Sequence, residues 1–87
     1  MKTERYLRTS NFNLASFLFT KEVELVDVDK ITDKKRAVFV FITSPAVEEL
    51  THAFSFAKDS DESVMVDVRK LTYATKALKE KLYQDNF

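Results

Sequence analysis

The chain has 87 residues, of which 45% are hydrophobic and 32% are charged, and its formal net charge is zero. It contains no cysteine and no glycine, which excludes disulfides, Cys-based zinc sites and the glycine-rich loops that cradle phosphates. The length predicts a single domain over residues 1–87, and the balanced charge argues against a partner recognised by bulk charge alone.

The longest unbroken apolar run is AVFVFI, far shorter than the roughly 20 residues that span a bilayer. The first ten residues, MKTERYLRTS, do not read as a signal peptide, because charged residues recur along them and no small-residue cleavage site follows an apolar core. We therefore expect a soluble protein of the cytoplasm that has no membrane partner.

The first two elements in chain order are predicted to be a short strand and a helix. Residues 3–9 alternate enough for a strand, and Asn11, with Ser10 as the alternative, is the expected N-cap of a helix that ends near Thr20. This helix has two apolar faces, although covering one side of a core requires only one. One face holds Leu14, Phe17 and Leu18, and the nearly opposite face holds Phe12, Ala15 and Phe19.

The middle of the chain is typical of a β-hairpin. Residues 22–28 are rich in β-branched side chains, residues 29–36 are polar and predict the hairpin loop, and residues 37–43 are apolar at almost every position. The third segment is therefore expected to be a central strand that is covered on both faces and pairs antiparallel with the first.

Two more helices are expected in the second half of the chain. Ser44 is the expected N-cap of a second helix with Pro45 at its first position, and Asp67 is the expected N-cap of a third helix that ends near Gln84. The predicted buried stripe of the second helix comprises Ala46, Val47, Leu50, Ala53, Phe54 and Ala57. The predicted buried stripe of the third comprises Val68, Leu71, Thr75, Leu78 and Leu82.

Between these helices, residues 58–63 are predicted to be a loop, and residues 64–66 a short strand or an extended connector. The element order is then β-α-β-β-α-(β)-α. This order predicts an α+β domain, in which a small antiparallel sheet has helices packed on it.

The residues suited to catalysis or metal binding are too few and too scattered to predict an enzyme. His52 is the only histidine and lies one turn after Glu48, but two ligands make no metal site and His52 is expected to face solvent. The aspartates at positions 27, 29 and 33 lack the glycine and the terminal glutamate of a calcium loop. We therefore predict no catalytic residue, no metal and no cofactor.

Charge is segregated along the chain despite the zero balance. Residues 46–67 hold six acids against one lysine, whereas residues 68–87 hold five bases against two acids and residues 30–36 hold four bases against one acid. The basic segments are typical of a solvated helix and of a turn kept soluble by its lysines. The alternative is nucleic-acid contact, with tyrosines stacking on bases. The candidate nucleic-acid contacts are Lys34, Lys35, Arg36, Arg69, Lys76 and Lys79.

Several aromatic residues have no obvious place in a one-sided core. Together they would make a patch large enough for an interface, and a homodimer is the commonest such arrangement in small domains. The alternative is that the first helix lies between the sheet and the third helix. The candidate interface residues are Phe12, Phe19, Phe56, Tyr73 and Tyr83, and Phe87 is a further aromatic without a core position.

The pattern resembles a family of small bacterial and phage proteins known only as a domain of unknown function. The resemblance rests on Thr9, on the segments LASFL at 14–18 and VFVF at 38–41, and on the LKEKLY ending at 78–83. It implies a compact single domain in a bacterial or phage setting, and it carries over no catalytic residue. The family tends to place a glycine just after the first helix, where this chain has Lys21 and Glu22.

These observations together favour a non-enzymatic interaction module that binds a protein partner or itself. The alternative is a nucleic-acid-binding protein that uses the basic third helix and the hairpin tip. A phage-encoded inhibitor of a host protein is a third reading, for which the acidic residues 59–62 are the only indication.

Overall fold

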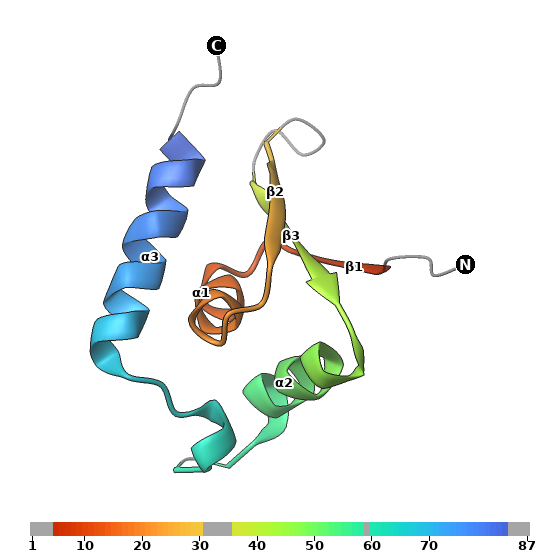
Figure 1. Cartoon of the computed structure of the whole chain (residues 1–87), viewed down its shortest axis with the longest axis vertical. Coiled ribbons are helices and arrows are strands. Elements are labelled where there is room, and N and C mark those ends of the chain that lie inside the picture. The colour runs from red at the N-terminus through yellow and green to blue at the C-terminus, as the bar shows by residue number, and fades with distance from the viewer. Residues whose placement is uncertain (1–4, 31–35, 59, 84–87) are drawn as a thin grey trace.

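The computed structural model of the protein describes residues 5–30, 36–58 and 60–83, and it confirms the α+β class. Within these ranges, three strands form one sheet, three α-helices pack with it, and a short 3-10 helix, η1, precedes the last helix (Figure 1). The elements are β1 (Arg5–Thr9), α1 (Phe12–Thr20), β2 (Leu25–Asp29), β3 (Val38–Thr43), α2 (Pro45–Phe56), η1 (Glu62–Val64) and α3 (Val68–Tyr83).

Each α-helix begins at the residue that the sequence predicts. The side-chain oxygens of Asn11, Ser44 and Asp67 accept hydrogen bonds from backbone N–H groups two or three residues further on, at 2.7 to 3.3 Å. These bonds satisfy donors that have no partner within the helix. The three N-caps therefore fix where α1, α2 and α3 start.

The sheet has the order β1-β3-β2, and both pairs are antiparallel, so β3 is the central strand as predicted. β2 is shorter at its start than the predicted 22–28, and the register shifts between Leu25 and Asp27. This bulge makes Val26 an extra residue, so Leu25 and Val28 both pack against the core although they are three positions apart.

The predicted strand at residues 64–66 does not form. Val64 ends η1, and Met65 continues as extended backbone toward α3. The segment is therefore the connector that was the alternative, and its first residue belongs to a 3-10 turn. No helix in the described part of the chain is both long enough and apolar enough to cross a membrane.

α1 lies in the centre of the molecule, and this explains its two apolar faces. Its residues from Leu14 to Leu18 are all buried. The ring of Phe12 packs edge-on against Phe39 of β3, with 6.0 Å between ring centroids, and Phe17 packs against Phe54 of α2 at 5.2 Å. α3 covers a further side of α1 (Figure 1). The predicted alternative, with α1 between the sheet and α3, is therefore the arrangement observed.

The prediction that β3 is covered on both faces is confirmed, because Phe39, Val40 and Phe41 are all buried. The helices gather on the side of the sheet that holds Phe39 and Phe41, whereas Val40 lies outside that core cluster (Figure 1). Val40 is nevertheless only 5% exposed. Arg8, its neighbour on β1, forms an ion pair of 2.7 Å with Asp29 of β2, so these side chains cross this face of β3.

The predicted buried stripes need three corrections. Val68 is 75% exposed and Ala46 is exposed, whereas Ala74, which was not assigned to a stripe, is 3% exposed. At about 100° per residue, Val68 lies about 80° from the fully buried Leu78 on α3, but Ala74 lies only about 40° from it. The stripe of α3 is therefore centred between Ala74 and Leu78.

α1 ends at a tight turn that normally uses glycine. Glu22 has φ 66°, its N–H donates to the Phe19 carbonyl at 3.0 Å, and the N–H of Val23 donates to the Leu18 carbonyl at 3.1 Å. This is a Schellman motif with Glu22 at the left-handed position. The family resemblance implies a glycine at this point of the chain. The reason is the positive φ, which glycine adopts more readily than any other residue.

We expect Glu22→Gly to raise the free energy of unfolding by about 1 kcal/mol, because glycine adopts positive φ without the steric cost of a Cβ. Chemical denaturation measures this change. Glu24→Gly is the matched control, since Glu24 has no positive φ and the added chain freedom should lower stability by about 0.5 kcal/mol. An equal loss in both variants would contradict the assignment.

Candidate functional site

The exposed face of α3 carries most of the residues that the sequence singles out for binding. Its buried side, centred on Ala74 and Leu78, packs on α1 and leaves the opposite side to solvent. We call this opposite side the α3 outer face. It comprises Val68, Arg69, Thr72, Tyr73, Lys76, Lys79, Glu80 and Tyr83, all of which are exposed.

The large side chains of this face are unusually exposed. Tyr73 is 78% exposed and Tyr83 is 82% exposed, and Val68 at 75% adds a third apolar group. The basic groups Arg69, Lys76 and Lys79 lie on the same face because they follow one another at helical spacing. The structure thus brings together the predicted protein-contact tyrosines and the predicted phosphate-contact bases.

Two shallow hollows follow each other along the α3 outer face. The first, of about 380 Å³, is bordered by Val68, Arg69, Thr72, Tyr73 and Lys76. The second, of about 540 Å³, is bordered by Thr72, Thr75, Lys76, Lys79, Glu80 and Tyr83. Four residues of the first hollow have the spacing i, i+3, i+4, i+7, which is the spacing of a hole that accepts a side chain from a neighbouring helix.

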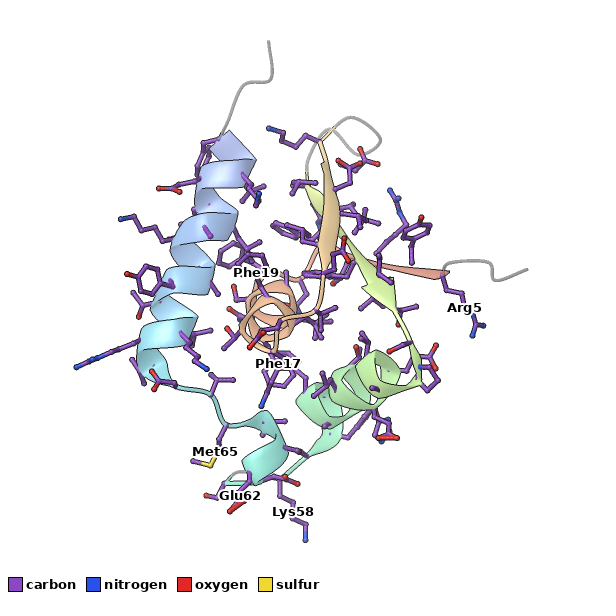
Figure 2. All side chains as sticks on the ribbon, in the orientation of Figure 1. Arg5, Phe17, Phe19, Lys58, Glu62 and Met65 are labelled. Carbon is purple, nitrogen blue, oxygen red and sulfur yellow. The ribbon has the colours of Figure 1, made fainter. Side chains whose placement is uncertain are left out.

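A groove of about 300 Å³ runs between α3 and the C-terminal end of α1. Figure 2 shows Phe19 on the side of α1 that faces α3 and Phe17 on the side toward α2. The groove is lined by Phe19, Thr20, Glu22, Lys70, Tyr73, Ala74 and Ala77. Tyr73 borders both this groove and the first hollow, so the two surfaces are continuous.

Phe12 and Phe19, two of the five predicted interface residues, pack within their own chain. Both are partly buried against the core cluster. The alternative, in which the sheet and α3 supply core positions on both sides of α1, accounts for this packing. Phe56, Tyr73 and Tyr83 are the predicted interface residues that remain on the surface.

Lys30, one of the basic residues predicted near the hairpin tip, lies against the C-terminal end of α3. The ammonium group of Lys30, at the end of β2, donates to the Leu82 carbonyl at 3.1 Å. Arg36 is exposed on the other side of the hairpin, and the predicted contacts Lys34 and Lys35 lie outside the described residues. The same applies to Asp33 and Phe87.

The exposed side of α2 forms a second, acidic surface. We call it the α2 outer face, and it comprises Glu48, Glu49, His52 and Phe56. The ring of His52 packs on that of Phe56 with 4.8 Å between centroids, and Phe56 is 74% exposed. In the described ranges, no three His, Cys, Asp or Glu side chains are grouped as they would be to hold a metal ion.

The turn before η1 carries the clearest electrostatic perturbation. Hydrogen bonds from the backbone N–H and the hydroxyl of Ser63 hold the pKa of Asp61 below its usual value. Both bonds favour the charged carboxylate. They cap η1, and Asp61 is fully exposed, so this group is a structural cap and not a candidate acid or base.

The comparison with protein families agrees with the resemblance found in the sequence. The sequence model of a domain of unknown function, DUF5659, matches residues 4–84, which is nearly the whole chain. The chain belongs to this family. Neither the curated proteins nor the solved structures yield a match.

The fold of this DUF5659 chain reveals two features that sequence reasoning missed. The hollow around Tyr73 was hidden because Val68 was assigned to the buried stripe. The α2 outer face was missed because Glu49 and Phe56 were considered separately. Two residues that are seven positions apart lie on the same side of a helix. Helical spacing applied to polar residues as well as apolar ones would have found both surfaces in this DUF5659 domain.

Proposed function

We propose that this domain is a non-enzymatic protein-binding module whose contact surface is the α3 outer face. One observation supports the proposal most strongly: Tyr73 and Tyr83 are both more than three-quarters exposed on a regular helix, beside Val68. Tyrosine and arginine are the residues most enriched among those that dominate interface energies. A helix also presents them with little loss of backbone freedom on binding.

The charges of this face favour an acidic protein partner. α3 carries five basic residues and one acidic residue, so an acidic protein surface would be favoured and would associate faster at low salt. The setting that we propose is the cytoplasm of a bacterium or of a phage-infected cell. It rests on the sequence composition and on the family resemblance.

Photo-crosslinking tests the proposal. A photoreactive phenylalanine analogue replaces Tyr73 in one variant and Tyr6 in a control, since Tyr6 is 54% exposed on β1, away from α3. We expect irradiation in the host cell to give discrete protein adducts from position 73 and none from position 6. Equal labelling at both positions, or no adduct from position 73, would contradict the proposal.

Nucleic-acid binding is the second candidate, and the contact between Lys30 and Leu82 favours it because it adds a basic side chain from β2 beside the basic helix α3. The chain has three tyrosines and no tryptophan, so its tyrosine fluorescence reports largely on Tyr73 and Tyr83. Single-stranded oligonucleotides at low salt would quench this signal by stacking, and Lys76→Ala with Lys79→Ala would weaken the effect. An unchanged signal excludes this candidate.

A further inference from the structure

The α2 outer face has the shape and charge of a partner for the α3 outer face. Glu49 and Phe56 are seven residues apart on α2, so they lie on one side of the helix about 10.5 Å apart along its axis. Glu48 flanks Glu49, and α2 contains no lysine or arginine. The face therefore presents two carboxylates toward the start of the helix and an exposed aromatic ring at its end.

The two hollows of the α3 outer face follow each other at the same seven-residue interval. The first hollow lies between Arg69 and Lys76, and the second lies around Lys76, Lys79 and Tyr83, one seven-residue interval further along. Ridges and hollows with matching repeats allow two helices to pack closely. The three basic residues at these hollows, Arg69, Lys76 and Lys79, outnumber the one acid, Glu80, and are complementary to the carboxylates of α2.

We infer that the α3 outer face of one copy of this chain binds the α2 outer face of a second copy, an inference that rests on the proposed function. Phe56 of the second copy occupies the first hollow, beside Val68 and Tyr73. Glu48 and Glu49 of the second copy then lie over Lys76 and Lys79.

The two helices run antiparallel in this contact. This direction places the Phe56 ring in the hollow that contains the exposed Val68, so an apolar group meets an apolar group. It also sets the helix dipoles in opposition, which is the favourable arrangement for adjacent helices. The aromatic pair formed by Tyr73 and Phe56 adds a further contact.

The contact joins two different surfaces, and each copy carries both of them. It is therefore heterologous, so that assembly continues from copy to copy or closes as a ring. One helix on one helix buries less area than a stable interface requires, so the association is weak. We expect self-association to begin at roughly 100 µM and to weaken as salt rises.

Light scattering after gel filtration of the full chain tests the inference. We expect the average mass to rise with concentration, and Phe56→Ser to weaken association at least tenfold. Met65→Ser is the matched control, because Met65 is 58% exposed on the connector and lies on neither face. A monomer up to about 1 mM, or equal association in both variants, would overturn the inference.

Charge reversal identifies the two surfaces. The double variant Lys76→Glu with Lys79→Glu and the double variant Glu48→Lys with Glu49→Lys should each be monomeric, because each carries two faces of like charge. Mixing the two should restore association, since every contact between them then joins opposite charges. Association of either variant alone, or no recovery on mixing, would contradict the proposed pairing.

These outcomes separate the inference from the proposed function. If the chain stays monomeric but position 73 still crosslinks to another protein, the α3 outer face is a binding surface and the second copy is not its partner. If position 73 gives no protein adduct and the chain stays monomeric, both are wrong.

Discussion

Leu78→Ala should lower the free energy of unfolding by about 3 kcal/mol. Leu78 is fully buried on the side of α3 that packs on α1, and truncating such a side chain removes its transfer free energy and leaves a cavity. Since Leu78 and Ala74 are the buried residues of α3, the loss falls on the contact that holds this helix to the domain. Urea denaturation followed by circular dichroism measures the change.

Val68→Ala is the matched control for this prediction. The sequence assigns Val68 to the same apolar stripe as Leu78, but the structure leaves it 75% exposed. We expect its truncation to change the free energy of unfolding by no more than about 0.5 kcal/mol. Comparable losses in the two variants would show that α3 is rotated relative to the described arrangement.

Phe12→Asp should destabilise the domain by at least about 3 kcal/mol. The Phe12 ring packs on Phe39, so a carboxylate at this position would lose that contact and enter an apolar environment. Phe56→Asp should cost less than about 1 kcal/mol, because the ring is 74% exposed. Thermal unfolding of the two variants gives the comparison.

The same pair of variants separates a core role from an interface role. A side chain used only at an interface changes the oligomeric state and leaves the monomer stable, whereas a core side chain changes stability. If Phe12→Asp unfolds normally and loses only self-association, Phe12 belongs to an interface and the described packing of α1 is wrong.

Sequence reasoning succeeded where one local interaction decides the structure. The N-caps at Asn11, Ser44 and Asp67 depend on a side chain and a backbone group a few residues away, and all three are confirmed. The apolar run of β3 likewise predicted a central strand correctly. Such features need no knowledge of the rest of the fold.

It failed where distant segments decide. The bulge at Val26 depends on the pairing of β2 with β3, and the ion pair beside Val40 joins Arg8 and Asp29, which are 21 residues apart. For residues 64–66 the sequence left a strand and a connector open, and the structure has the connector.

The sequence predicted most residues of the candidate site, but it did not predict how they are distributed between the surface and the core. The tyrosines and bases of α3 were named from composition and spacing, and the structure places them on one face. The sequence left Phe12 and Phe19 open between a partner and the core, because it does not show which side of α1 the last helix covers. That contact joins α1, which ends at Thr20, to α3, which begins only at Val68.

The central position of α1 has a consequence for how the domain opens. α1 has nine residues, fewer than the roughly 12 to 15 that an isolated helix needs in water, so its helical state depends on the elements around it. Its backbone amides should therefore exchange their hydrogens with solvent only when the whole domain opens, whereas amides at the ends of the 16-residue α3 exchange by local fraying. The shortest α-helix of the fold should thus be the slowest to exchange.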